Sequence, residues 1–91
     1  IIGDFMYNII ERYIKNLSKE QVNNFALKNN VNLSGLELDF LYVFIKKNYK
    51  EVLANPSLLN LDRYKTKFSE ENFVKIKKLF NEYLSKYGSY L

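Results

Sequence analysis

One segment, residues 38–45, restricts the fold of this chain more than any other, because it is apolar on almost every face. A helix that is apolar all round is typically a buried helix. Ser34 and Glu37 form a capping box just before the segment, and Asn55 followed by Pro56 ends it, since the residue before a proline is pushed out of helical geometry. We therefore predict a long central helix over about residues 36–54.

The part of the chain before this helix shows two further helical patterns. Apolar side chains recur at three- and four-residue steps and predict a first helix over about residues 4–16. Ser18 and Gln21 form another capping box, which opens a second, shorter helix. That helix ends at Asn29 and Asn30, because asparagine tolerates the left-handed conformation of a C-terminal cap.

The part after the central helix shows a short and a long pattern. Asn60 caps a short connecting helix, Ser69 caps the final helix, and Gly88 ends it. Gly (3) and Pro (1) are scarce, so turns are few and helices are favoured over strands. We predict an all-α fold, a small bundle of four main helices plus a short connecting helix, packed around a central buried helix at about residues 36–54. A length of 91 residues suits a single helical domain over residues 1–91.

The composition excludes most catalytic chemistry. Cysteine and histidine are both absent, which removes disulfides, thiolate and imidazole catalysis, and nearly every zinc or haem site. Glu37 and Asp39 are two residues apart on a helix and point to different sides, so they do not form an acid–base pair. We expect a protein that is not an enzyme, with no catalytic, cofactor-binding or metal-binding residues and no cofactor.

Positive charge is concentrated in the second half of the chain. Residues 1–45 hold four basic and five acidic side chains, whereas residues 46–91 hold ten and five. This asymmetry is typical of a protein with an anionic partner, and it predicts a weak, sequence-independent nucleic-acid face at Lys46, Lys50, Lys75 and Lys78. Lysine outnumbers arginine 12 to 2, however, which indicates an AT-rich bacterial genome, and two of these four lysines, Lys75 and Lys78, have i,i+4 acidic neighbours. Nucleic acid is therefore the alternative partner, not the favoured one.

Residues 25–34 have the spacing of a helix–turn–helix, with a small residue, a turn, an apolar residue and a cap. A recognition helix needs exposed donors near its N-terminus to reach base edges. Here the first positions of the next helix include Leu36, Glu37 and Asp39, which are apolar or acidic and would repel phosphate. We interpret the motif as a helical corner of the core.

A partner protein fits the remaining features better. Tyrosine is amphipathic and stiff, which suits a partner surface, and Tyr64 and Tyr90 are the candidates for one. The central helix has apolar residues on different sides, at Phe40, Leu41 and Phe44. A chain of 91 residues supplies few neighbouring helices to cover all of these sides. A homodimer would close an open side, and the C-terminal tail would cover it within a monomer; both remain open. We predict a protein–protein interaction module or small adaptor.

No segment predicts a membrane protein. The longest apolar run has six residues, whereas a spanning helix needs about twenty. Residues 1–6 have no basic region of the kind that begins a signal peptide. We expect a soluble, cytoplasmic protein with no membrane partner.

A set of cap and core positions spread over residues 17–87 forms one further pattern. Its members are Leu17, Ser18, Ala26, Leu27, Asn30, Val31, Leu33, Ser34, Phe68, Ser69, Glu70, Glu71, Leu79 and Phe80. In these positions the chain resembles the YqfT-like family of short, uncharacterised helical proteins of Bacillus and Clostridium relatives. The resemblance implies a small helical cytoplasmic protein, and it implies no site residue because the family has no assigned activity. Residues 49–65 form a longer middle segment than that family leads us to expect.

Overall fold

The computed structural model describes residues 2–55 and 59–87 of the chain. Within these residues every regular element is a helix, which confirms the all-α prediction. The elements are α1 (Ile2–Lys15), α2 (Lys19–Lys28), α3 (Gly35–Ala54), the 3-10 helix η2 (Leu61–Lys67) and α4 (Glu70–Tyr87). The predicted four main helices and the short connecting helix are therefore all present, with ends within two residues of those expected. Pro56, Gly88, Tyr90 and the tail at 88–91 lie outside the described residues.

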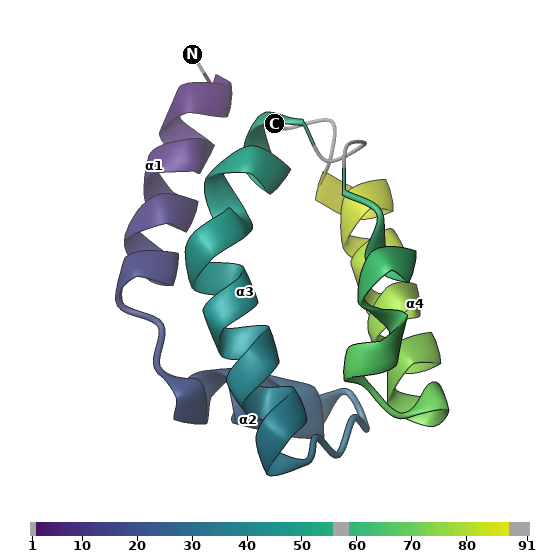
Figure 1. The fold of residues 1–91 in the computed structure, drawn as a ribbon. Helices are drawn as coiled ribbons and strands as arrows, with labels where there is room; N and C mark the ends of the chain where they lie inside the picture. Colours follow the sequence, from purple (N-terminus) through teal and green to yellow (C-terminus); the bar gives the residue numbers. More distant parts are fainter. Residues whose placement is uncertain (1, 56–58, 88–91) are drawn as a thin grey trace.

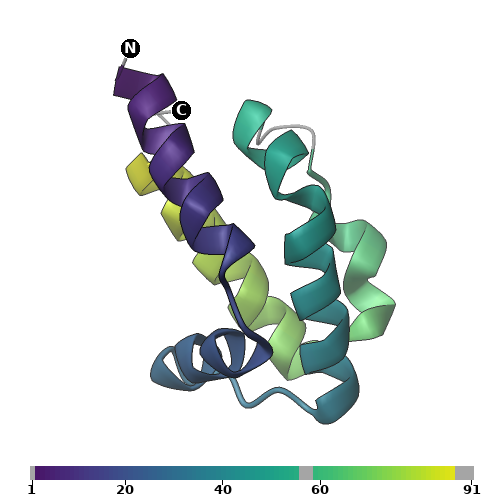
Figure 2. The same ribbon diagram turned by 90° about the vertical axis from the view of Figure 1, so that its left-hand side faces the viewer.

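Helix α3 occupies the middle of the arrangement (Figure 1). Helices α1 and α2 both pack against it, and η2 packs against α4. In Figure 2, α2 lies across the end of the molecule where α1 finishes. In Figure 1, α1 and α4 flank α3, and in Figure 2, α4 lies behind α1. The N-termini of α3 and α4 lie close together, since Glu37 accepts the N–H of Ser69.

The serine caps predicted from the sequence form as expected. Ser18 and Gln21 exchange both hydrogen bonds of a capping box, with Oγ accepting from the Gln21 N–H at 3.1 Å and the Ser18 N–H donating to Oε1 at 2.8 Å. Ser34 and Glu37 make the same exchange at the start of α3. Asn30 follows α2 with a φ of 63°, the left-handed conformation predicted for this turn.

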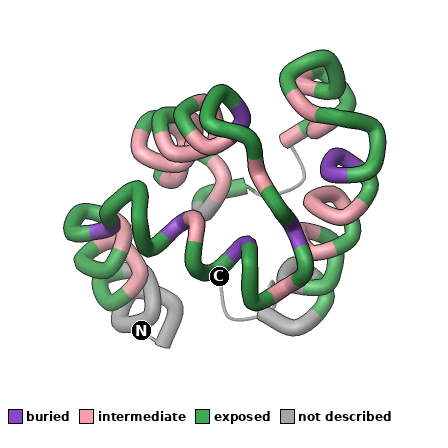
Figure 3. The backbone as a smooth tube through the Cα atoms, turned by 90° about the horizontal axis from the view of Figure 1, so that it is seen from below, coloured by how far each residue is buried: buried purple, intermediate pink, exposed green. Residues whose placement is uncertain are grey.

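Helix α3 is central, but the predicted burial of residues 36–54 is only partial. Glu37 is the one buried residue among those of α3 whose side chains are described, and Leu36 is 84 % exposed. The buried apolar residues lie in α2, in the turns on either side of it, and at the start of α4: Leu17, Val22, Ala26, Val31 and Phe73 (Figure 3). A pattern that is apolar all round predicts a helix that needs cover on every side, but the neighbouring helices leave part of α3 exposed.

An aromatic cluster joins η2 to one side of α3. The rings of Phe44 and Tyr64 meet edge to face, with centroids 4.9 Å apart. Phe40 contacts both Tyr64 and Phe68, at 5.8 Å and 5.6 Å between centroids. Offset and edge-to-face pairs of this kind add to the energy of apolar burial. The cluster therefore holds the segment that leads into α4 against the central helix.

Candidate functional site

Two of the four lysines predicted to form an anion-binding face have partners within the chain. The Lys46 ammonium donates to the carbonyls of Ile14 and Lys15, at 2.8 Å and 2.9 Å. These carbonyls end α1, where a cation favours the negative end of the helix dipole. The Lys75 ammonium lies 2.8 Å from the Asn30 carbonyl and 3.2 Å from a Glu71 carboxylate oxygen.

The other predicted site residues are dispersed. Lys50 is exposed on α3, and Lys78 lines a hollow between η2 and α4 that also contains carboxylates. Tyr64, a candidate for a partner surface, is half-buried in the aromatic cluster on α3. Tyr90 lies outside the described residues.

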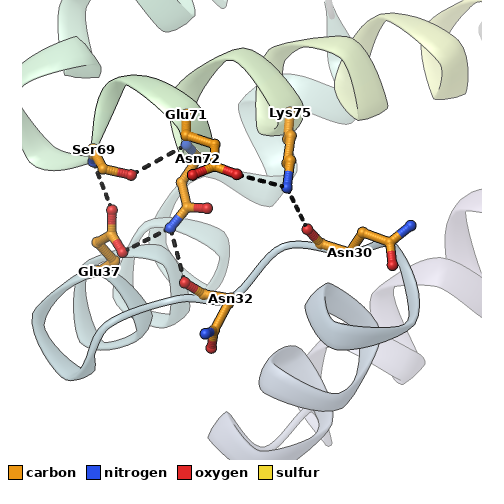
Figure 4. A network of polar contacts seen from close by, with 7 residues as sticks. All are labelled: Asn30, Asn32, Glu37, Ser69, Glu71, Asn72 and Lys75. Atoms are coloured by element: carbon orange, nitrogen blue, oxygen red, sulfur yellow. Dashed lines mark hydrogen bonds and ion pairs between the residues drawn. The ribbon is translucent and has the colours of Figure 1, made fainter.

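A buried carboxylate instead joins the starts of two helices, as Figure 4 shows. Glu37 Oε1 accepts the N–H of Ser34, the cap of α3, at 2.8 Å, and its Oε2 accepts the N–H of Ser69, which precedes α4, at 2.7 Å. The side-chain amide of Asn72 donates to Glu37 Oε1 at 3.0 Å. One side chain therefore satisfies the orphan donors of two helix N-termini. We call the set Ser34, Glu37, Ser69 and Asn72 the polar clamp.

Asn72 extends the polar clamp to the connection between α2 and α3. Its side-chain amide also donates to the Asn32 carbonyl at 2.9 Å, and its backbone N–H donates to Ser69 Oγ at 3.1 Å. Both Asn72 and Glu37 are buried. Among the described residues, no buried side-chain nitrogen or oxygen lacks a hydrogen-bond partner. The polar clamp is therefore satisfied by the chain itself.

The pKa of Glu37 reflects two opposing effects. Burial of the carboxyl group by itself raises its pKa, because a low dielectric disfavours the charged form. The N–H groups of Ser34 and Ser69 and the amide of Asn72 donate to the ionised form and lower the pKa. The hydrogen bonds prevail, so the pKa of Glu37 lies below its ordinary value of 4.5 and the carboxylate stays charged at neutral pH. A group held ionised and fully bonded is suited to support the fold and not to transfer protons.

An apolar groove lies between the four α-helices. It has a volume of about 390 Å³, and its walls are nearly all apolar, with the Tyr13 hydroxyl and the Gln21 amide as the polar groups. The groove is lined by Tyr13, Leu17, Gln21, Val22, Phe25, Ala26, Val31, Leu41, Ile45, Ile76, Leu79 and Phe80. Ligand-binding pockets commonly measure about 300–1,000 Å³, so this groove is at the lower end of that range.

The groove opens to solvent at an aromatic mouth. Tyr13 and Phe25 are both exposed although they line the groove. A shallow hollow lined by Ile9, Arg12 and Asn16 adjoins this mouth and shares Tyr13 with the groove. Exposed aromatic side chains next to an apolar depression are typical of the anchor sites of protein interfaces.

Sequence reasoning did not locate the groove. The central helix was expected to be either enclosed or open on one side, and the structure shows how its faces divide. Phe40 and Phe44 contact η2, whereas Leu41 and Ile45 line the groove. No sequence signal was available for it, because Phe25 lies on the apolar stripe of α2 and periodicity alone marks such a residue as core. Only the structure shows that its side chain is exposed.

The described part of the chain contains no group of three His, Cys, Asp or Glu residues placed to hold a metal ion. None of the helices described is both long enough and apolar enough to cross a membrane. Comparison of the chain with family models, with curated proteins and with solved structures finds no match. The resemblance to the YqfT-like family therefore stays a prediction, and the argument for function depends on the groove.

Proposed function

We propose that the protein is a protein–protein interaction module that binds one amphipathic helix of a partner in the apolar groove. The observation that carries this proposal is a groove of about 390 Å³ that four helices form and in whose lining no described residue is charged. None of the residues that the structure describes covers this apolar area, and contiguous exposed apolar area commonly marks an interaction site.

A helix fits this groove better than other occupants do. Helix-in-groove recognition places apolar anchors at positions i, i+3, i+4 and i+7 of the guest into a hydrophobic depression between host helices. The walls contributed by α2 and α4 carry Phe25 and Phe80, which offer broad apolar contacts to such anchors. The Gln21 amide oxygen accepts the Ser18 N–H, so its NH₂ group is the part that can donate to a polar side chain of the guest.

The nucleic-acid alternative has less support. Lys46 and Lys75 each donate to backbone carbonyls of the chain, so binding a phosphate would require their ammonium groups to give up these hydrogen bonds. Lys50 and Lys78 are exposed, but they lie on different helices. Weak electrostatic binding to nucleic acid weakens steeply with salt, and this property separates the two functions.

The test uses the full chain and a display library of amphipathic helical peptides. The diagnostic variant is Phe25→Glu, and the matched control is Leu27→Glu on the same helix: the two side chains are 45 % and 50 % exposed, but only Phe25 lines the groove. We expect selected peptides to bind the wild type and Leu27→Glu, and to lose at least about tenfold in affinity for Phe25→Glu, because a charge in an apolar contact is costly to desolvate.

Two results would contradict the proposal. Selected peptides that bind both variants equally would place the contact outside the groove. Tight binding of a short DNA duplex at moderate salt, with affinity that falls steeply as salt rises, would favour the nucleic-acid alternative instead.

A further inference from the structure

We infer that the groove selects an acidic helix, one whose apolar anchors are flanked by carboxylates. This inference rests on the proposed function and specifies the chemistry of the partner. It is carried by the charges around the groove, which are basic on two helices and are not matched by acidic side chains at the same edge.

Arg12 and Lys28 are the basic residues at the groove edge. Arg12 is exposed and lines the hollow that adjoins the mouth beside Tyr13. Lys28 is exposed on α2, three residues after Phe25 and seven after Gln21. Residues three, four and seven apart share one face of a helix, so Lys28 lies on the same side of α2 as these two groove residues.

A third cation, Lys75, lies next to residues of the groove wall. Lys75 immediately precedes the groove residue Ile76, and its ammonium contacts the carbonyl of Asn30, next to Val31 in the groove wall. Glu71 pairs with Lys75 and balances its charge. The uncompensated positive charge at the edge therefore comes from Arg12 and Lys28.

The carboxylates near these helices are directed elsewhere. Among the residues that the structure describes, no acidic residue lines the groove or the adjoining hollow. Glu11 pairs with Lys15 along α1, and Glu82 lines the hollow between α4 and η2. Glu20 is exposed on α2 five residues before Phe25, which places it about 140° around the helix from that groove residue. A guest with lysines beside its anchors would meet like charge, whereas a guest with glutamates would meet Arg12 and Lys28. Electrostatic complementarity of this kind sets specificity and association rate more than total affinity.

The experiment compares two synthetic peptides of fifteen residues with the full-length chain. Both peptides carry leucine at positions i, i+3, i+7 and i+10, and the flanking positions hold glutamate in one peptide and lysine in the other. Fluorescence anisotropy gives the affinity of each. We expect the acidic peptide to bind about tenfold more tightly, which corresponds to about 1.4 kcal/mol, because it makes two exposed ion pairs where the basic peptide makes two like-charge contacts. High salt should bring this ratio toward one.

Charge reversal identifies the residues responsible. Lys28→Glu should reduce the preference for the acidic peptide at least about threefold, because one exposed pair becomes a like-charge contact. The matched control is Lys65→Glu, which makes the same change in net charge at an exposed residue of η2 outside the groove. We expect this control to retain the wild-type preference, since screened charges act over about 10 Å at 0.1 M salt.

The outcomes distinguish the inference from the proposed function. If both peptides bind equally and Phe25→Glu weakens both, the groove binds helices but the charge selection is wrong. If neither peptide binds, the proposed function fails and the inference fails with it. If the acidic peptide binds Phe25→Glu as tightly as the wild type, the contact is electrostatic attraction outside the groove, and this also overturns the inference.

Discussion

Replacing Glu37 by glutamine is the sharpest test of the polar clamp, because the side chain keeps its shape and loses its charge. The two carboxylate oxygens receive three hydrogen bonds, two at Oε1 and one at Oε2. A glutamine has one oxygen and one NH₂ group, so the NH₂ group must face either the Ser69 N–H or the donors of Ser34 and Asn72. In each orientation at least one donor faces another donor in a buried site.

The expected cost follows from this count. A hydrogen bond to a charged group is worth about 1.5–3 kcal/mol, and an unsatisfied buried donor costs about 1–3 kcal/mol. Loss of one charge-assisted bond, with weakening of the other two, leads us to expect a fall of about 3 kcal/mol in the free energy of unfolding. A chain of 91 residues has roughly 5–14 kcal/mol in total. At about 4–8 °C per kcal/mol for a domain of this size, Tm should fall by about 12–24 °C.

Urea unfolding followed by far-ultraviolet circular dichroism at neutral pH gives the measurement. Glu71→Gln is the control, because it makes the same chemical change in a carboxylate that is 79 % exposed and has one ion pair. We expect this control to cost less than about 0.5 kcal/mol, as is usual for a surface pair. A loss for Glu37→Gln no larger than that of Glu71→Gln would refute the argument that the polar clamp stabilises the fold.

The same urea assay tests the pH dependence of the polar clamp and two further residues, Lys46 and Asn30. Because folding lowers the pKa of Glu37, the contribution of the polar clamp is complete above about pH 4.5 and is lost as the pH falls through the lower pKa of the folded state. The difference in urea midpoint between wild type and Glu37→Gln should therefore stay constant at neutral pH and narrow as the pH is lowered below about 4.5. Lys46→Met keeps the apolar stem but removes the donor to the end of α1, and should cost about 1 kcal/mol; an unchanged midpoint would contradict the capping role. Asn30→Val should cost about 1–2 kcal/mol because a β-branched residue is strained at a φ of 63°, whereas Asn30→Gly should stay within about 0.5 kcal/mol of wild type.

The helices could be predicted because their signals are local. A serine followed three residues later by a side chain that can reach back is visible without knowledge of the fold, and the caps at Ser18 and Ser34 form as the sequence indicates. Asn30 likewise acts within its own turn. Signals that act within four residues need no information from the rest of the chain.

The polar clamp shows where local signals end. The capping box predicts that Glu37 accepts the Ser34 N–H, but not that its second oxygen accepts the N–H of Ser69, 32 residues later. Asn72 gives no periodic signal, since a buried asparagine inside an apolar stripe is identified only by its partners. The partners of Lys46 and Lys75 could not be predicted either. Both ammonium groups donate to backbone carbonyls, which every residue carries, so the sequence does not identify the acceptor.

The division of the α3 faces depends on packing over still longer separations. Phe40 and Leu41 are adjacent in the sequence and equally apolar, yet one joins the aromatic cluster and the other lines the groove. The positions of η2 and α4 in the folded chain determine which face of α3 is packed against a neighbouring helix. The composition of residues 38–45 therefore predicts a helix that needs cover, but it does not show which side remains open.

The polar clamp gives a physical reason why the groove remains open. Apolar burial favours closing the space between α3 and α4, at about 0.8 kcal/mol for each CH₂ group removed from water. Any shift of α4 that separated Ser69 and Asn72 from Glu37 would leave a buried carboxylate without its partners, and breaking a buried charge contact in this way costs about 3–5 kcal/mol. The Phe44–Tyr64 contact opposes such a shift from the side of η2. Polar contacts at the start of α4 and aromatic contacts of η2 thus fix this end of α4, and Ile76, Leu79 and Phe80 remain in the lining of an open groove.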